Sequence, residues 1–326
     1  MKKTITSQPN PQISCEANNL CYFLGIDGGG TKTVFRLTDE NGAVIREILL
    51  GAVNPNDIGM ENAMSVLKKG ITEICRDIAF SDVTMFAGIA GGGLSGNNLV
   101  ILKHFFEQFG FFAFDNGSDI ENTIALSEDE PRVHVIMGTG FIVYALNEDF
   151  RKRIGGWGQF FDEGGSGYTL GRDAVTAVLC EGDGSGKPTA LTALLEKRIG
   201  ETAEAHLTQF YRKGKSYIAG FSDLVFEAAE SGDPIATDIL EKNMAFAAQR
   251  IDAACNALAH FRESTRSIPV FFSGGISRKS DVIFPLIQSH LNTRTCSLIR
   301  LDADPVEGAV RRAQKLFELK IKENQS

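Results

Sequence analysis

The sequence predicts an α/β protein made of two related halves. Apolar strand-like runs alternate with helix-like segments, a pattern typical of parallel sheets with crossover helices. A block of strand, glycine turn, strand, polar turn and strand occupies residues 21–50, and the same block recurs at residues 133–154. The 326 residues are enough for two domains, each with its own core.

The first half opens with an apolar run, 21–26, that predicts a buried strand ending at Asp27. Three glycines follow, and then hydroxyl side chains around a lysine. Renewed apolar alternation and the polar turn at 39–42 predict a hairpin, which places the glycines in a turn between strands. The next elements are expected to be an amphipathic helix through about residue 78, a strand at 83–90, a helix at 98–108, a strand at 111–114 and a short helix to about 126.

The second half has its own glycine turn, Gly138-Thr139-Gly140, between predicted strands at 133–137 and 141–146. The chain beyond residue 164 is mainly helical, and it ends with a helix that opens at Asp304-Pro305, where proline is tolerated. The helices are expected at about 166–180, 189–199, 203–211, 221–231, 234–260 and 281–290, with strands at 270–273 and 297–301.

Composition narrows the class of protein. Hydrophobic and charged contents of 43% and 23% are ordinary for a globular protein, and a net charge of −8 disfavours nucleic acid or an anionic membrane as a partner. Six cysteines without a Cys-x-x-Cys pair argue for a reducing compartment and against zinc. Without a signal peptide or an 18-residue apolar span, we expect a cytoplasmic protein whose residues 1–19 form a disordered tail.

The first glycine turn predicts a phosphate site. Glycines let the backbone approach a ligand closely, and a turn of this kind can point successive N–H groups at one anion. The carboxylate of Asp27 implies an intervening metal ion, and oxygen ligands suit Mg²⁺. The dinucleotide fingerprint does not fit, because no helix follows the glycines. An ordinary tight turn would explain the glycines alone, but the aspartate, the hydroxyls and the strand–turn–strand setting favour nucleotide phosphate.

The segment Asp27–Thr33, Asp-Gly-Gly-Gly-Thr-Lys-Thr, resembles the first phosphate loop of the actin, heat-shock-chaperone and sugar-kinase superfamily. From about Phe23 to about Phe317 the chain is similar to its N-acetylglucosamine kinase and BadF/BadG/BcrA/BcrD ATPase branch. The resemblance implies a two-lobe, actin-like ATPase (ribonuclease H-like) fold, α/β in class, with duplicated mixed β-sheets and flanking helices. It implies lobes at 20–130 and 131–304, with a C-terminal helix at 305–326 that returns to the first lobe.

The same resemblance implies ATP and Mg²⁺ as cofactors. Asp27 would act on Mg²⁺, mostly through water, and Ser273-Gly274-Gly275 resembles the family's adenosine loop. Each glycine turn by itself is also compatible with an ordinary turn. The implied nucleotide-binding residues are Gly28, Gly29, Gly30, Thr31, Lys32, Thr33, Gly138, Thr139, Gly140, Gly274 and Gly275.

Asp119 is the candidate catalytic base. It precedes a short predicted helix, where an aspartate would also serve as an N-cap. The segment resembles the family's aspartate that accepts the proton of the attacking sugar hydroxyl, and the two roles are compatible. Asp115, within the preceding strand, is the nearest competitor and matches the motif less well.

A second signature surrounds the single tryptophan of the chain. The segments 155–158 (Gly-Gly-Trp-Gly) and 162–167 (Asp-Glu-Gly-Gly-Ser-Gly) resemble the family's sugar-binding region, and the ring of Trp157 is expected to shape a pocket wall. Asn54 matches a sugar-contacting asparagine, although a turn-forming role is equally compatible. The implied sugar-binding residues are Asn54, Gly155, Gly156 and Asp162.

These features predict an ATP-dependent hexosamine kinase with a small-molecule sugar substrate, N-acetylglucosamine phosphorylated at its 6-hydroxyl being favoured. Phe141-Ile142 stands where N-acetylglucosamine-specific relatives carry Ser-Asn, which leaves the sugar's identity and retention of activity open. The alternatives are a non-catalytic nucleotide- or sugar-binding sensor and a BadF/BadG-type activator ATPase with an Fe–S cluster, for which Cys180 alone is loosely placed. The helix at 235–258 suits either a core or a homodimer interface.

Overall fold

The computed structural model of the chain describes residues 21–93, 96–127, 129–148, 150–261, 267–293 and 295–325. The predicted tail at 1–19 lies outside these residues. The chain divides into two compact units, Met1–Ser127 with Ala303–Ser326, and Glu128–Asp302. Each unit contains one five-stranded sheet.

The sheet of the first unit has the strand order β3-β2-β1-β4-β5. β1 pairs antiparallel with β2 and β2 with β3, whereas β1 pairs parallel with β4 and β4 with β5. The glycine turn therefore joins two hairpin strands, as predicted. The strands are β1 (Tyr22–Gly28), β2 (Lys32–Thr38), β3 (Val44–Gly51), β4 (Val83–Ile89) and β5 (Ala113–Gly117).

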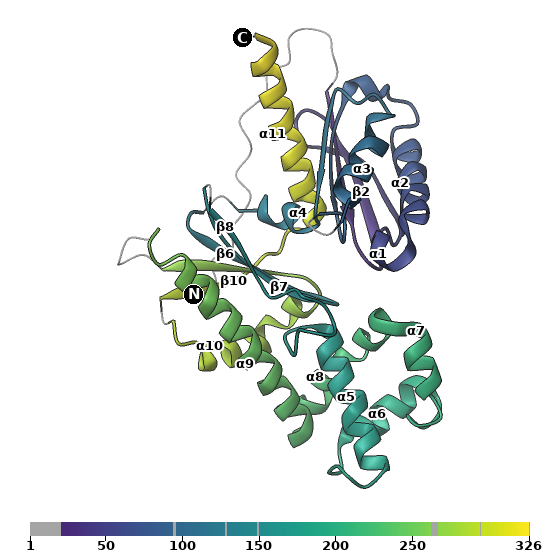
Figure 1. The fold of residues 1–326 in the computed structure, drawn as a ribbon, viewed down its shortest axis with the longest axis vertical. Helices are drawn as coiled ribbons and strands as arrows, with labels where there is room; N and C mark the ends of the chain where they lie inside the picture. Colours follow the sequence, from purple (N-terminus) through teal and green to yellow (C-terminus); the bar gives the residue numbers. More distant parts are fainter. Residues whose placement is uncertain are drawn as a thin grey trace. The chain divides into compact units, whose positions relative to one another are not determined.

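Helices cover both faces of this sheet (Figure 1). Alternate residues of β1 point to opposite faces, so Leu24 joins the core under α2 and α3, while Phe23 packs against α11. The rings of Phe23 and Phe317 meet edge to face with centroids 5.7 Å apart. The helices are α1 (Pro55–Ile58), α2 (Met60–Ile74), α3 (Asn98–Glu107), α4 (Ile120–Ile124) and α11 (Pro305–Gln325).

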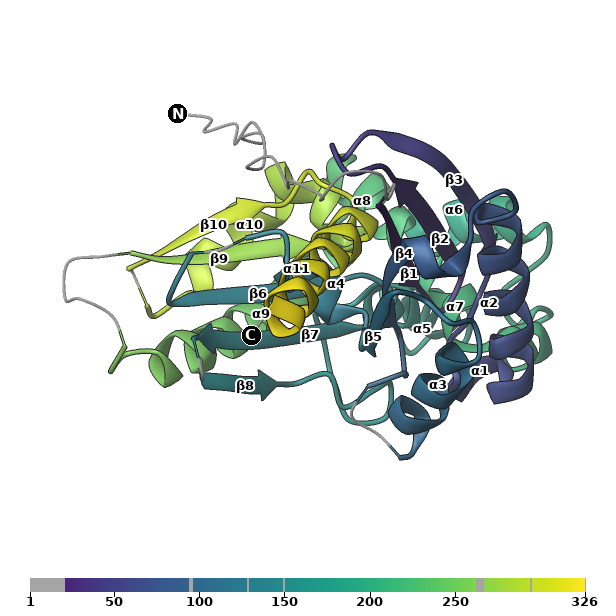
Figure 2. The same ribbon diagram turned by 90° about the horizontal axis from the view of Figure 1, so that it is seen from above.

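The sheet of the second unit repeats the first topology. Its strands lie side by side in the order β10-β9-β6-β7-β8 (Figure 2), with antiparallel β6–β7 and β7–β8 pairs and parallel β6–β9 and β9–β10 pairs. This confirms the predicted duplication and the mixed character of both sheets. The strands are β6 (Arg132–Met137), β7 (Phe141–Asn147), β8 (Phe150–Ile154), β9 (Ile268–Ser273) and β10 (Cys296–Arg300).

The second unit has a larger helical core than the first. Apolar side chains of β6, β7 and β9 pack against α5, α8, α9 and α10 in one continuous cluster. In the part of the chain that the structure describes, none of the helices is long and apolar enough to cross a membrane. The helices are α5 (Gly167–Gly182), α6 (Ala190–Ile199), α7 (Leu207–Ala219), α8 (Ser222–Glu230), α9 (Pro234–Ala257) and α10 (Ser280–His290).

Three elements differ clearly from expectation, the first being α2, which ends at Ile74 rather than at about residue 78. β5 runs over Ala113–Gly117 rather than 111–114, because its parallel pairing with β4 continues as far as Gly117 opposite Gly88. α7 runs over Leu207–Ala219 rather than 203–211, and it is kinked at Gly214, whose φ is 68°. Pairing and packing across the unit extend β5 and α7 beyond the local apolar pattern.

Candidate functional site

The first glycine turn offers free backbone donors. Gly29 N–H donates to Lys32 O at 2.9 Å, and a Cβ on Gly29 would lie 2.8 Å from that same oxygen, so this close approach requires glycine. Within the described ranges, nothing accepts a hydrogen bond from the N–H groups of Gly30 or Thr31. Two successive unused donors of this kind suit an anion.

The side chains of this turn are used unequally. Thr33 is buried, and its hydroxyl donates to Gly51 O at 2.7 Å, so the oxygen is committed to the hairpin. Thr31 and Lys32 are exposed and remain accessible. The turn therefore presents N–H groups, one hydroxyl and one ammonium group to a ligand.

Asp27 is the penultimate residue of β1, and its carboxylate meets a buried amide of the same unit. Its Oδ1 accepts a hydrogen bond of 2.8 Å from Nδ2 of Asn122, a fully buried residue of α4. Burial raises the pKa of the Asp27 carboxyl, and Asp304 adds to the rise, while Asn122 and the charge of Lys32 oppose it. The sequence reasoning missed Asn122; its only signal is an amide side chain inside a short, otherwise core-facing helix.

Asp119 begins α4 as its N-cap, the structural role considered for it. Its Oδ1 accepts a hydrogen bond of 3.1 Å from the N–H of Ile120. Burial, and then the nearby charge of Asp27, raise the pKa of Asp119 to about 6. A carboxylate whose pKa approaches neutrality is a better proton acceptor than an ordinary aspartate. Asp115 lies within β5, opposite Phe86 of β4.

Asn54 lies beside the first glycine turn and forms the N-cap of α1. Its Oδ1 accepts from Asn56 N–H at 3.1 Å, and its Nδ2 donates to Oδ2 of Asp57 at 2.6 Å. That Asp57 oxygen would lie 3.3 Å from a Cβ on Gly30. The turn-forming role of Asn54 is therefore realised, and Asp57 is a neighbour of the turn that the sequence reasoning did not single out.

The acidic groups of this unit fit Mg²⁺ held mainly by substrate and water. Among the described residues, no group of three or more His, Cys, Asp or Glu side chains forms a metal cluster. Mg²⁺ is commonly held by one or two carboxylates together with waters and substrate phosphates. Burial is the largest cause of the raised pKa values of Asp27 and Asp119, and a neighbouring carboxylate adds to each rise, a charge that a cation would offset. Asp27 is the residue whose position fits this use.

The second glycine turn is attached to the start of α5. Gly138 N–H donates to Gly140 O at 2.9 Å, while Gly138 O accepts from Gly167 N–H at 2.7 Å. Thr139 O accepts from Tyr168 N–H at 3.3 Å. The N–H groups of Thr139 and Gly140 have no acceptor in the described part of the chain. Both turns thus expose two successive donors.

The loop after β8 is shaped by glycines and by Arg153. Arg153 donates its Nε–H to Gly155 O at 3.1 Å, and its guanidinium lies 4.7 Å from the ring centroid of Trp157. Trp157 is 59% exposed, and its ring stacks on Arg153 at the surface of its unit. Ile142 fills the space behind the loop, since a Cβ on Gly156 would lie 2.6 Å from its Cδ1.

Asp162 combines one satisfied oxygen with one unsatisfied oxygen. Its Oδ2 accepts from Gly158 N–H at 2.9 Å, which closes the tryptophan loop. Its Oδ1 is buried without a hydrogen-bond partner among the described residues, although the side chain is only 7% exposed. A Cβ on Gly155 would lie 3.6 Å from that oxygen. A buried acceptor without a partner is costly, and a ligand hydroxyl would satisfy it.

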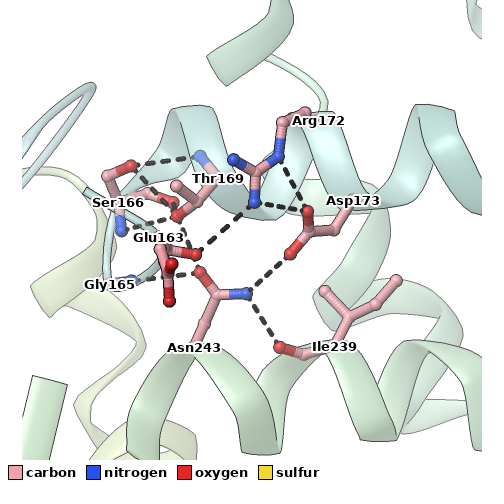
Figure 3. Close-up of polar contacts among 8 residues, drawn as sticks. All are labelled: Glu163, Gly165, Ser166, Thr169, Arg172, Asp173, Ile239 and Asn243. Carbon is pink, nitrogen blue, oxygen red and sulfur yellow. Dashed lines mark hydrogen bonds and ion pairs between the residues drawn. The ribbon is translucent and has the colours of Figure 1, made fainter. Parts of the chain in front are cut away.

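A buried polar network holds the chain that follows Asp162 (Figure 3). Asn243 of α9 is fully buried, and its Oδ1 accepts from Gly165 N–H at 3.0 Å and from the hydroxyl of Thr169 at 2.7 Å. Its Nδ2 donates to Ile239 O at 2.9 Å and to Oδ2 of Asp173 at 3.3 Å. One asparagine therefore fixes both the loop and the first turn of α5, a role that its sequence position does not reveal.

The turn after β9 touches the second glycine turn. Gly274 has a φ of 93°, and a Cβ there would lie 2.5 Å from Met137 O, so both conformation and space require glycine. Gly274 and Gly275 are exposed, and the hydroxyl of Ser273 is buried without a partner in the described residues. The glycines expected to bind adenosine and the second phosphate turn thus lie together.

Each unit gathers its own share of the predicted residues. The first unit brings together Asp27, the glycine turn that follows it and Asn54, with Asp119 in electrostatic reach of Asp27. The second brings the turn at 138–140 against Gly274, and Asp162 against Gly155. Phe141 lies in the hydrophobic core, where its ring contacts Phe246 and packs behind Gly165, while Ile142 packs behind Gly156, so both residues of the divergent pair support the candidate sugar-binding segments.

Comparison with known proteins gives a consistent family. Residues 24–312 match the BadF/BadG/BcrA/BcrD ATPase family. N-acetyl-D-glucosamine kinase of Dictyostelium discoideum is 26% identical over 307 residues, covering 88% of this chain and 96% of that protein. N-acetylmuramic acid/N-acetylglucosamine kinase of Clostridium acetobutylicum is 27% identical over 302 residues, covering 89% and 97%.

A solved structure supports the same fold. A protein from Chromobacterium violaceum, provisionally named N-acetylglucosamine kinase, is 24% identical, with a TM-score of 0.68 over 91% of this chain and 100% of that chain. This likeness confirms the actin-like ATPase fold that the sequence predicted.

Proposed function

Because the chain belongs to the BadF/BadG/BcrA/BcrD ATPase family, we propose that it is an ATP-dependent hexosamine kinase that phosphorylates N-acetylglucosamine at its 6-hydroxyl. Two relatives, each matched over nearly their whole length, are named as kinases of N-acetylglucosamine. The observation that carries the proposal is the arrangement of two acidic groups: buried Asp119, with a pKa raised to about 6, lies within electrostatic reach of Asp27, which precedes the first glycine turn. A base, a carboxylate for a metal and free phosphate donors are gathered in one unit.

Asp119 would act as the general base. Its carboxylate would accept the proton of the sugar 6-hydroxyl while that oxygen bonds to the γ-phosphorus and the bond to ADP breaks. A pKa of about 6 leaves Asp119 mostly ionised at neutral pH and still basic enough to take a proton. Its hydrogen bond from Ile120 N–H holds the carboxylate at the start of α4.

The two glycine turns would hold the nucleotide phosphates. Phosphoryl transfer requires mainly positioning and stabilisation of charge, and backbone donors supply both without reorganising. The donors would be the N–H groups of Gly30, Thr31, Thr139 and Gly140, with Lys32 adding a positive charge. Gly28 and Gly29 would let the phosphates approach, whereas the Thr33 hydroxyl stays with Gly51. Mg²⁺, held by Asp27 mostly through water, would offset phosphate charge.

The remaining predicted residues would bind the sugar and the adenosine. The unsatisfied Oδ1 of Asp162 is an acceptor for a sugar hydroxyl, and the backbone of Gly155 and Gly156 would line the same place. A buried acceptor of this kind rejects analogues that lack the hydroxyl. Asn54 would contact the sugar from the first unit, while Gly274 and Gly275 would lie against adenosine.

The activator alternative receives less support. Cys180 lies near the end of α5, packed on Gly186. Thirteen residues of helix separate it from Gly167 at the second glycine turn, which is roughly 20 Å at 1.5 Å per residue. We therefore propose sugar phosphorylation rather than service to an Fe–S cluster.

Sugar-dependent ADP release tests the proposal. The protein would be incubated with Mg·ATP and, separately, N-acetylglucosamine, glucosamine, N-acetylmuramic acid and glucose, with ADP measured by chromatography. We expect turnover with N-acetylglucosamine at least tenfold above the sugar-free rate, and a product phosphorylated at the 6-hydroxyl. ATP binding without any sugar-dependent ADP would overturn the kinase proposal in favour of a sensor.

A further inference from the structure

We propose that Lys215 binds the phosphate groups of the nucleotide at the second glycine turn. The inference rests on the proposed function, because it assigns a ligand group to the site described there. Lys215 belongs to α7, outside every motif that the sequence singled out. It would add a positive charge to a turn whose other contacts with phosphate are neutral backbone donors.

The ammonium group lies directly at the turn. A Cβ placed on Gly140 would lie 3.6 Å from Nζ of Lys215. The side chain is half-buried, and within the described residues it makes no hydrogen bond or ion pair. A partly desolvated ammonium without an acidic partner favours an anionic ligand.

The fold holds Lys215 in this place through two contacts. Gly138 O accepts from Gly167 N–H at 2.7 Å, which attaches the turn to α5. A Cβ on Gly171 would lie 1.9 Å from Ile218 O, so the end of α7 packs tightly on the first turns of α5. Lys215 precedes Ile218 by three residues, one helical turn, and the kink at Gly214 begins this segment of α7.

The ammonium group of Lys215 is better suited to a phosphate than to a sugar. Hydroxyl groups are satisfied by neutral donors and acceptors, whereas an ammonium is a point charge with three donors that suits phosphate oxygens. The unused N–H groups of Thr139 and Gly140 lie in the same turn. One cation and two backbone donors form a complementary set for the β- or γ-phosphate.

The experiment compares the affinity for ADP with that for adenosine, without sugar, by calorimetry on the full chain. Lys215→Met is expected to weaken ADP binding about 10- to 100-fold, as for loss of a charge-assisted hydrogen bond, and to change adenosine binding less than about twofold. Lys215→Arg should restore most of the ADP affinity. Lys213→Met is the matched control, since the Lys213 ammonium lies 4.3 Å from the ring centroid of Tyr217 and is already engaged.

Three outcomes would overturn the inference: equal ADP affinity in Lys215→Met and the unmodified chain, equal loss for ADP and adenosine, or equal loss in Lys213→Met. Thermal melting of each variant distinguishes misfolding from loss of the phosphate contact. Lys215→Arg keeps the positive charge, so it tests whether that charge is what ADP binding requires. Failure of the proposed function looks different, because the unmodified chain would bind ADP yet release none in response to sugar. Absence of ADP binding by the unmodified chain would overturn both.

Discussion

The two glycine turns have the same backbone setting and opposite electrostatic surroundings. Both join an antiparallel strand pair at the same position of a five-stranded sheet, and in both two successive N–H groups have no acceptor among the residues that the structure describes. Asp27 precedes the first turn, and its charge adds to the burial that raises the pKa of Asp119. The second turn has Met137 in the place of Asp27 and the ammonium of Lys215 beside it.

This contrast shows how duplicated topology acquires different chemistry. The repeated hairpin supplies anion-binding backbone in each unit, and side chains from other elements set the charge around it. In the first unit those side chains come from α4, which carries Asp119 and Asn122. In the second the charge comes from α7, which carries Lys215. We infer that the first turn serves metal and proton transfer and the second serves neutralisation of phosphate charge.

The largest expected effect comes from replacing Asp119, the proposed base in the first unit. Asp119→Asn should lower kcat by about 10²- to 10⁴-fold, because the amide cannot accept the proton of the sugar hydroxyl. ADP binding should remain within about twofold of the unmodified chain. Asp115→Asn is the matched control and should keep its turnover. Steady-state ADP release at saturating sugar measures both, and normal turnover of Asp119→Asn would remove the proposed base.

Replacing Asp27, the carboxylate that precedes the first glycine turn, is expected to have opposite effects on catalysis and on stability. Asp27→Asn should lower kcat by about 10²- to 10³-fold through lost stabilisation of phosphate charge. The same change should raise the melting temperature at pH 7 without Mg²⁺. Burial raises the pKa of Asp27 in the folded chain. At pH values above the pKa of an ordinary aspartate, the ionised carboxylate therefore lowers the free energy of unfolding, and the neutral amide removes this penalty.

The exposed Glu73→Gln on α2 is the control for the loss of one negative charge, and it should alter neither quantity. A lower melting temperature for Asp27→Asn would contradict the electrostatic account of this turn.

The pH profile sharpens the same contrast. As pH falls below about 6, Asp119 takes up a proton, so kcat/KM should fall about tenfold per pH unit and stay level between pH 7 and 8. ADP measured by chromatography avoids a pH-sensitive coupling enzyme. A profile that stays level down to pH 4.5 would show that no group with this pKa acts as the base.

The smallest effect concerns the network that supports the second unit. Asn243→Ala leaves the Gly165 N–H without its acceptor and removes one hydrogen bond each from Thr169 and Asp173, so the free energy of unfolding should fall by about 2–3 kcal/mol. Because the network holds the loop after Asp162, KM for the sugar should rise about tenfold while ADP affinity is unchanged. Gln249→Ala, exposed on the same helix, should change neither. Equal losses of sugar and ADP affinity would indicate general unfolding rather than loop positioning.

Much of the fold was predictable because its signals are local. The hairpin around Gly28–Gly30 follows from an apolar run, glycines and a polar turn, and its repetition at Gly138–Gly140 predicted the second sheet. The Asp27–Thr33 motif and the Gly-Gly-Trp-Gly segment were sufficient to predict the family, which the match over residues 24–312 confirms. The bounds of β5 and α7 were not predictable, since pairing with β4 and packing on α5 determine them.

The sequence alone determined the order of the strands along the chain, the two glycine turns and the family. Tertiary structure decided which side chains meet at those turns. Asn122 meets Asp27 across 95 positions, and Asn243 meets Gly165 across 78. Lys215 reaches Gly140 only because α7 packs on α5. The charge of Asp27, which adds to the raised pKa of Asp119, likewise comes from a segment far along the chain. A local pattern records what one segment prefers, whereas charge and burial depend on its neighbours in space.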